Sequence, residues 1–351
     1  MQPHSKSMKK LVVVGGGFAG MYIARKMENE FEVTLIDTKD YFEFPPGILR
    51  ALVKPGAEKN LQVKHSDYLN NAKFILGAVN SIHNKFVIVN GKKIKYDYLA
   101  LCSGSAYTSP FKDKHVLIAS HTRDLLKYHS SIEKSNSIAI VGGGLVGVEL
   151  AAEIAHYYPH KKLTLIHSKE SLIERNPQKA RRYALRYLLE KKAWVLLNQL
   201  ATKVTKNKVE TDKKFSFPAD VVFMCTGIRP NTIYFDKHFK RCLDKRGFVI
   251  VDEKLRVKGT ENIFAAGDIT NVFEEKTGQN AEKHAMTVVN NIRALEHGKD
   301  MKAYNSKKRP IVISLGPFRG IFVYKGLVIT GILPGFLKWI IEKREMWRYR
   351  R

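Results

Sequence analysis

Short apolar runs and helix-like segments alternate along this chain, and one arrangement of them occurs twice. A run at 10–14 is followed by a glycine-rich turn, a helix-like segment and a β-branched run at 33–37. The same order returns with a run at 137–141, a turn, a helix-like segment and a run at 163–167. Apolar strands that alternate with helices are typical of βαβ units and a parallel sheet. The pattern therefore predicts an α/β protein with two such units.

Both turns carry the glycine fingerprint G-x-G-x-x-G of dinucleotide-binding folds. Its members are Gly15, Gly17 and Gly20 in the first turn and Gly142, Gly144 and Gly147 in the second. The first glycine permits a tight turn, the second lets the backbone approach a pyrophosphate, and the third lets the helix pack on the strand. One copy alone is weak evidence, because a glycine-rich turn can be purely structural. Two copies, each between a strand and a helix, predict two bound dinucleotides and electron transfer between them.

The residue that ends the second strand of each unit indicates which dinucleotide binds. An acid at this position accepts hydrogen bonds from the adenosine ribose and repels a 2′-phosphate. Asp37 therefore predicts FAD in the first unit. In the second unit His167, followed by Ser168 and Lys169, predicts tolerance of both NADH and NADPH. The alternative is that these three residues only form a polar strand end.

Three further apolar runs end in small or acidic residues of the kind found at cofactor-binding strand tips. These residues are Ser103 and Gly104 after the first run, Gly227 after the second and Asp268 after the third. A carboxylate at Asp268 can hold flavin ribityl hydroxyls and can also cap the helix that follows. The order of the runs predicts two Rossmann-like domains, with the second inserted in the first. The expected parts are an FAD-binding domain at 1–112 and 247–300, an NAD(P)H-binding domain at 113–246 and a small C-terminal region at 301–351.

Composition narrows the range of functions. Of the 351 residues 44% are hydrophobic, and the formal net charge is +27. The positive charge is concentrated at 161–214 and 301–351, which suits nucleic acid or an anionic membrane surface. The cysteines Cys102, Cys225 and Cys242 form no C-x-x-C pair. This spacing predicts a reducing compartment such as the cytoplasm, no metal site and no redox disulfide.

The segment 335–351 predicts a helix that lies on a membrane surface. It mixes Phe, Trp, Leu and Ile with six basic residues, as interfacial helices do. Lys343 and Arg344 interrupt the apolar face, so a helix packed on its own protein is the alternative. No charge-free apolar run reaches the ~18 residues that a spanning helix needs. We therefore expect a cytoplasmic protein that is peripheral on a membrane.

Taken in order, the motifs from VVVGGGFAG to IFAAGD span residues 11–270 and resemble the pyridine nucleotide–disulfide reductase superfamily. The stretch at 147–170 is most similar to its apoptosis-inducing-factor-like NAD(P)H:quinone oxidoreductases, the ferroptosis-suppressor branch. The type II NADH dehydrogenases are also similar, and both groups reduce membrane quinones through FAD. The resemblance implies a glutathione-reductase-like fold with FAD as cofactor and NADH or NADPH as substrate.

The resemblance also implies roles for individual residues. The positions that match the FAD site of these families are Gly15, Gly17, Gly20, Asp37, Ser103, Gly104 and Asp268, with Arg50 as a less specific match. Glu149 matches a glutamate near the nicotinamide–flavin contact, where it can tune the flavin or relay a proton. The alternative for Glu149 is an acid that interacts only with the dipole of its own helix.

The chain departs from type II dehydrogenases in the helix beside the quinone. Those enzymes carry A-Q-x-A-x-Q-Q, whereas this chain has GQNAEKH at 278–284. Gln279 matches, and Lys283 and His284 replace two glutamines, so Gln279 and Lys283 are candidates for the quinone site. His284, which the ferroptosis-suppressor branch shares, is a candidate catalytic donor to the quinone oxygen. A helix residue without a catalytic role is the alternative.

The expected function is hydride transfer from NAD(P)H to FAD and then two-electron reduction of a membrane quinone, by a monomer or homodimer. Two other functions stay open. A soluble ferredoxin- or rubredoxin-type reductase would have the same two domains, and a basic face would bind an acidic ferredoxin. A nucleic-acid-binding flavoprotein, like some relatives of apoptosis-inducing factor, would use the basic run at 178–187.

Overall fold

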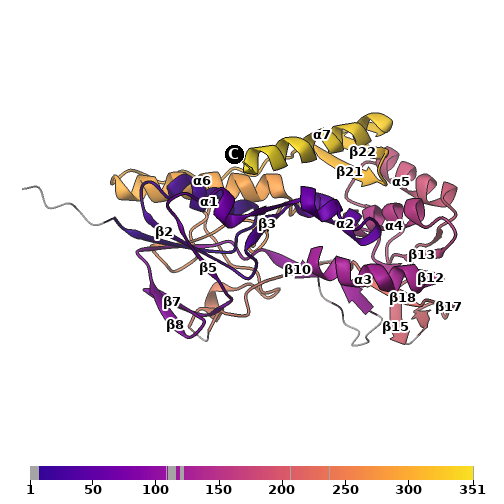
Figure 1. Cartoon of the computed structure of the whole chain (residues 1–351), viewed down its shortest axis with the longest axis horizontal. Helices are drawn as coiled ribbons and strands as arrows, with labels where there is room; N and C mark the ends of the chain where they lie inside the picture. The colour runs from indigo at the N-terminus through magenta and orange to yellow at the C-terminus, as the bar shows by residue number, and fades with distance from the viewer. Residues whose placement is uncertain are drawn as a thin grey trace, which may run out of the picture.

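The computed structural model describes residues 8–107, 109, 116–118, 122–205, 207–236 and 238–350. These residues form two lobes, each built on a parallel sheet of five strands, and a C-terminal helix bridges them (Figure 1). The predicted α/β class with two Rossmann-like domains is confirmed.

The first sheet has the strand order β20-β9-β1-β2-β5. Its strands are β1 Lys10–Val14, β2 Glu32–Asp37, β5 Lys73–Leu76, β9 Tyr98–Leu101 and β20 Ile263–Ala265. Leu11 and Val13 pack into a core with helices α1 (Phe18–Met27) and α6 (Gly278–Glu296), and Val12 packs into the core on the other face. Strand β1 is apolar from Leu11 to Val14 because this part is covered on both faces.

The second sheet repeats the first, with the order β11-β18-β12-β13-β14. Its strands are β11 Val116–Ile118, β12 Ser137–Val141, β13 Lys162–Ile166, β14 Trp194–Leu196 and β18 Val221–Met224. The helices of this lobe are α3 Thr122–Lys134, α4 Leu145–Tyr157 and α5 Gln178–Glu190, and α2 (Pro45–Val53) reaches over from the first lobe to pack on α3 and α4.

Small antiparallel sheets complete both lobes. They are formed by β3 Tyr41–Glu43 with β4 Gln62–Lys64, by β6 Val79–His83 with β7 Phe86–Val89 and β8 Lys92–Lys95, and by β15 Ala201–Thr205 with β16 Lys208–Thr211 and β17 Ser216–Pro218.

The chain passes between the lobes along a two-stranded ribbon. Strand β10 (Ser105–Tyr107) leaves the first lobe and pairs antiparallel with β19 (Ile228–Pro230), which returns to it. The second domain is therefore inserted in the first, as expected. The return comes earlier than the expected boundary at 246/247, because Tyr234 and Phe239 already pack in the first-lobe core with Leu99. These aromatic residues lie in a loop without a periodic pattern, so no pattern of apolar positions predicts their burial.

The C-terminal region consists of three strands followed by the predicted helix. Strands β21 Ile311–Leu315, β22 Arg319–Tyr324 and β23 Leu327–Gly331 form an antiparallel sheet, and helix α7 (Ile332–Tyr349) packs on it. Gly335 permits this packing, since a Cβ there would lie 2.6 Å from the carbonyl oxygen of Phe318.

Helix α7 carries charged residues on its inner face and apolar residues on its outer face. Lys338, Glu342 and Glu345 are buried. The exposed large apolar residues are Ile332, Leu333, Phe336, Trp339, Ile340 and Trp347. One face of the helix therefore packs on the protein, the other face is exposed, and contact of that face with a membrane stays a prediction. Within the residues that the structure describes, no helix combines the length and apolarity needed to cross a bilayer.

Candidate active site

The first glycine turn joins β1 to α1 with almost no spare space. Gly15 has a φ of +99°, and a Cβ there would overlap the carbonyl of Cys102. A Cβ at Gly20 would overlap the carbonyl oxygen of Gly15. Around Gly17, by contrast, no atom lies within 4 Å of a Cβ position. Gly15 and Gly20 are thus required by the fold, whereas Gly17 leaves room at the start of α1, where N–H groups bind a pyrophosphate.

The second turn repeats this geometry between β12 and α4. A Cβ at Gly142, whose φ is +114°, would overlap the carbonyl of Cys225, and one at Gly147 would overlap Gly142. Gly144 faces open space. The two strand-tip cysteines are buried and unpaired, and burial raises the pKa of both thiols. That these two cysteines form no redox pair stays a prediction.

In each glycine turn a backbone N–H donates a hydrogen bond to a side chain at the end of the second strand, and the two side chains differ. Asp37 accepts a hydrogen bond from the backbone N–H of Gly16 through Oδ2. In the second lobe His167 Nδ1 accepts the equivalent N–H of Gly143 at 3.1 Å, and its Nε2 lies 3.3 Å from Glu174 Oε2. The imidazole replaces the carboxylate as acceptor for the turn. Sequence reasoning missed Glu174, which brings an acid close to the strand end, and dual use of NADH and NADPH stays a prediction.

The ribbon between the lobes brings the remaining strand tips together. Ser103 Oγ donates to Asn231 O at 2.8 Å and contacts Tyr234 OH at 2.7 Å. Gly104 and Gly227 both have positive φ, +63° and +115°, and a Cβ at either would meet nothing within 4 Å. Both glycines thus leave space beside the ribbon, where a flat ring system can approach the backbone.

Asp268 lies at the end of β20 and faces the same ribbon. Ser105 Oγ donates to its Oδ2 at 3.1 Å. Burial raises the pKa of Asp268, although Lys276 and the Ser105 hydrogen bond oppose the rise. Burial also raises the pKa of Tyr107, and Cys225, Asp268 and Glu149 add to the effect. Tyr107 therefore lies in the field of carboxylates from both lobes.

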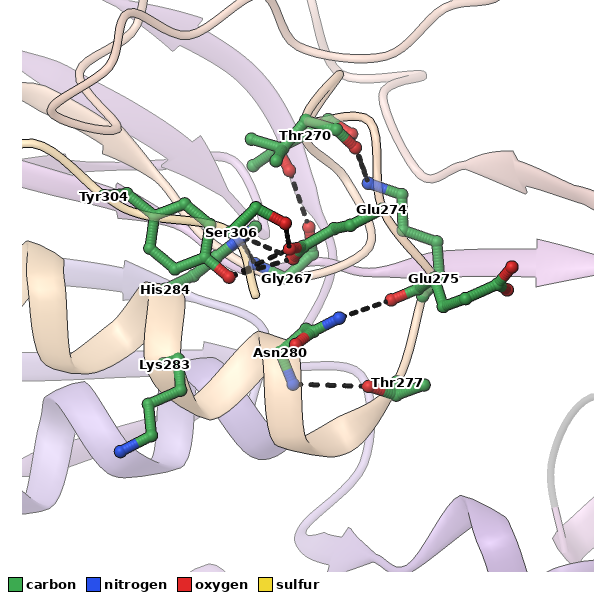
Figure 2. A network of polar contacts seen from close by, with 12 residues as sticks. Gly267, Thr270, Glu274, Glu275, Thr277, Asn280, Lys283, His284, Tyr304 and Ser306 are labelled. Carbon is green, nitrogen blue, oxygen red and sulfur yellow. Dashed lines mark hydrogen bonds and ion pairs between the residues drawn. The ribbon is translucent and has the colours of Figure 1, made fainter. Parts of the chain in front are cut away.

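His284 is part of a buried network that holds the turn before Asp268 (Figure 2). Its Nδ1 accepts the N–H of Gly267 at 3.1 Å, and its Nε2 lies 2.9 Å from Glu274 Oε1. Tyr304 OH donates to Glu274 Oε2 at 2.9 Å, and Ser306 Oγ donates to the same oxygen. Burial raises the pKa of Glu274, but hydrogen bonds from His284 and Ser306 outweigh it, and the net shift is downward.

The contacts of His284 are with the protein itself. The residue is 1% exposed, and both ring nitrogens face groups of the protein. This arrangement favours the alternative without a catalytic role, in which His284 holds Gly267 and the turn before Asp268, and a direct role toward a quinone stays a prediction. Sequence reasoning missed Glu274, Tyr304 and Ser306, because nothing near them in the chain marks them as partners of a histidine on α6.

Gln279 and Lys283 lie on the other side of α6. Both are exposed, and Figure 2 shows Lys283 pointing away from the His284 network. Gln279 Nε2 donates to Pro310 O at 3.4 Å, and Lys283 Nζ lies 3.3 Å from Met286 Sδ. They remain candidates for contact with an electron acceptor.

Glu149 joins the second glycine turn to the C-terminal region. Its Oε1 accepts hydrogen bonds from Ser314 N and from Lys338 Nζ, both at 2.8 Å. Lys338 was not found from the sequence, which presented it as one cation of a surface helix. Arg50 has its Nη1 3.3 Å from Glu342 Oε1 on α7, and the expected contact of Arg50 with FAD stays a prediction.

Glu153 lies one turn after Glu149 on α4, between Arg50 and α7. It is 3% exposed, and its Oε2 has no hydrogen-bond partner within the described part of the chain. Burial raises the pKa of Glu153 to about 7, with Arg50 opposing and Glu149 reinforcing the rise.

Two glycine turns, an acid at the first strand end and a buried aspartate beside the ribbon define an FAD-dependent NAD(P)H oxidoreductase. The open positions at Gly17 and Gly144 fit one dinucleotide each. The chain belongs to the pyridine nucleotide-disulphide oxidoreductase family, whose sequence profile matches residues 9–293.

Known proteins support this assignment over most of the chain. Human ferroptosis suppressor protein 1 is 30% identical over 344 residues, which cover 93% of this chain and 92% of that protein. The solved structure of sulfide:quinone oxidoreductase from Aquifex aeolicus is similar with a TM-score of 0.84 and 20% identity, covering 97% of this chain and 91% of the other. NDH2 from Plasmodium falciparum, solved in complex with NADH, is similar with a TM-score of 0.82 and 17% identity, covering 98% of this chain and 99% of the other. The predicted resemblance, FAD as cofactor and NAD(P)H as substrate are confirmed.

Alanine should have different effects at Gly20, where a Cβ has no room, and at Gly17, where it meets no protein atom. In Gly20→Ala the methyl group overlaps the Gly15 carbonyl, so we expect a loss of about 3 kcal/mol in the free energy of unfolding. Gly17→Ala meets no protein atom, so we expect normal thermal unfolding of the apoprotein and at least tenfold weaker FAD binding. Flavin fluorescence titration and calorimetry measure the two effects. Normal FAD affinity in Gly17→Ala would remove this glycine from the pyrophosphate site.

Replacement of His284 should weaken FAD binding before it affects the acceptor. His284→Ala leaves the Gly267 N–H and Glu274 without their partner, a cost of about 1–3 kcal/mol. We expect about tenfold weaker FAD binding with an unchanged KM for the acceptor, and partial rescue by His284→Asn, whose amide oxygen can replace Nδ1. Unchanged FAD affinity together with a higher KM for the acceptor would instead indicate that His284 acts directly on the acceptor.

The free energy of unfolding should decrease as the pH rises, because Glu153 is buried. Its pKa is 4.5 in a model peptide and about 7 in the fold, so the native state holds an extra proton between these values. Stability then falls as the pH rises through this window. Glu153→Gln should remove this loss and be more stable than wild type by about 3 kcal/mol above pH 7. Denaturant unfolding from pH 4 to 8 measures it, with the exposed Glu170→Gln as control, and parallel curves for wild type and Glu153→Gln would refute it.

Proposed function

We propose that the protein is an NAD(P)H:quinone oxidoreductase that works at an anionic membrane surface. The observation that carries this proposal is the outer face of α7. Its exposed side chains include Phe336 at 55%, Trp339 at 49% and Trp347 at 56%. Water-exposed aromatic and aliphatic side chains on one helix face mark an interaction site rather than an ordinary protein surface.

The charges on this face fit a lipid surface. Lys343 and Arg344, which interrupt the apolar pattern, are exposed on the same helix. The rings of Phe336 and Trp339 stack at 5.6 Å between centroids. Aromatic rings among cations are characteristic of helices that lie between headgroups and acyl chains. An enzyme held there would meet a quinone that is dissolved in the membrane.

The acceptor is proposed from two lines of support. The Aquifex aeolicus structure with the same fold is a sulfide:quinone oxidoreductase by name. The resemblance to type II NADH dehydrogenases implies the same class of acceptor. Gln279 and Lys283 lie exposed at the start of α6, near the Pro310 carbonyl, where an acceptor can approach the first lobe from outside.

The chain's own residues bind, align and balance charge. Bound FAD supplies the hydride acceptance and the two-electron transfer. The two glycine turns would hold the pyrophosphates, and the Asp268 carboxyl would hold flavin hydroxyls. Glu149 is paired with Lys338, so a carboxylate and an ammonium group lie together at the contact between the lobes. This pair can stabilise charge as it moves between the dinucleotides.

Substitutions on the outer face of α7 test the membrane part of the proposal. Deleting the helix is unsuitable, because it also removes the buried Lys338 and Tyr349. In the triple variant Phe336→Ser/Trp339→Ser/Ile340→Ser we expect at least tenfold weaker binding to phosphatidylglycerol vesicles. Turnover of a lipid-tail quinone in those vesicles should fall to the same extent, while NADH oxidation with a short-chain quinone stays near wild type.

The matched control is Ile233→Ser/Leu200→Ser, which removes two exposed apolar side chains elsewhere. It should leave vesicle binding unchanged. Equal vesicle binding of wild type and the triple variant would refute the surface on α7. Rapid flavin reduction by NADH with transfer to a ferredoxin but to no quinone would refute the acceptor.

A further inference from the structure

Phe18, the first residue of α1, packs its aromatic ring against three other rings. Phe18 lies inside the glycine fingerprint, directly after Gly17. Its ring centroid is 5.2 Å from that of Phe42, 5.8 Å from Phe44 and 6.4 Å from Tyr349. A Cβ on Gly278, at the start of α6, would clash with the same ring. The pyrophosphate turn is therefore packed against residues that are far from it in the sequence.

Tyr349 belongs to the last turn of α7 and is one of the most buried residues of this helix. It is 3% exposed, and its ring lies 4.6 Å from that of Phe42. The same turn is bonded to the first lobe at two further points. Arg25 Nη1 on α1 donates to the carbonyl of Arg348 at 3.1 Å, and Arg348 Nη2 lies 2.8 Å from Glu282 Oε1 on α6.

A second set of contacts leads from this cluster to the acid at the first strand end. Tyr68 is buried in the same cluster as Tyr349, and its hydroxyl contacts Nδ1 of the buried His65. His65 Nε2 lies 3.9 Å from Asp37 Oδ2. Asp37 accepts the N–H of Gly16. The cluster therefore contacts the glycine turn directly through Phe18 and indirectly through His65 and Asp37.

We propose that the last turn of α7 is part of the FAD-binding site, with Tyr349 as a positioning residue that fixes Phe18 and Phe42 and so holds the turn in its binding geometry. In this proposal Tyr349 acts through Phe18 and Phe42. It fills the space behind the turn, and without it Phe18 can move into that space and carry the first N–H groups of α1 out of line. Pre-organised donors bind an anion more tightly, because no binding energy is spent on ordering them. This role does not depend on which acceptor the enzyme uses.

The test is FAD binding by the full-length apoprotein, followed by flavin fluorescence. For Tyr349→Ala we expect at least a tenfold higher dissociation constant for FAD and faster FAD release. Tyr349→Phe, which keeps the ring, should bind as wild type does. Tyr349→Leu keeps apolar volume without the ring and serves if the alanine variant does not fold, and it should weaken FAD binding by several-fold.

A matched control separates this role from general loss of stability. Tyr187 is 4% exposed in the core of the second lobe, and Tyr187→Ala should lower the melting temperature of the apoprotein while leaving FAD affinity unchanged. Hydrogen exchange of the amides at 15–20 should be faster in Tyr349→Ala and normal in Tyr187→Ala. Wild-type FAD affinity in both Tyr349→Ala and Tyr349→Leu would overturn the proposal. A similar loss of affinity in Tyr187→Ala would also overturn it, by showing that any core defect releases FAD.

Discussion

Both cofactor sites depend on a backbone approach that only glycine permits. In each turn the third glycine lies against the carbonyl of the first, so the helix begins directly on the tip of the strand. The carbonyls of Cys102 and Cys225 close the turns from the neighbouring strands. This contact fixes the helix dipole and its free N–H groups at one point in space. The other elements of the site, from the strand-end acceptors to Glu149, are placed relative to that point.

What the sequence could predict is what short segments determine by themselves. The strand–turn–helix order, the fingerprint glycines and Asp37 are local features, and the fold contains them as expected. The roles expected for His284 and Arg50 come from matches to the motifs of known families, whereas their partners in the fold come from elsewhere in the chain. Arg50 meets Glu342, 292 residues away, and no spacing rule connects the two. Long-range partners exist only once the sheets and helices have packed, so a single sequence does not reveal them.

Helix α7 shows why an amphipathic pattern alone is ambiguous. A helix whose buried face is apolar and one whose buried face is charged can have the same periodicity. Here the inner face meets Glu149 and Arg50, so Lys338 and Glu342 point inward to pair with them. The apolar side chains are then left outside. The sequence showed that the helix has two faces, but only the charges on its partners determine which face is buried.

The ribbon of β10 and β19 and the helix α7 together determine how the lobes can move. Two strands side by side act as a hinge, and a hinge alone allows the lobes to open and close. Helix α7 joins the lobes a second time, through Lys338 and Glu149 at one point and Tyr349 and Phe42 at another. Because the lobes are joined both by the ribbon and by α7, rotation of one lobe about either connection is restricted by the other. The two lobes that carry the glycine turns are thus parts of one closed frame, in which the ribbon is one connection and α7 is the other.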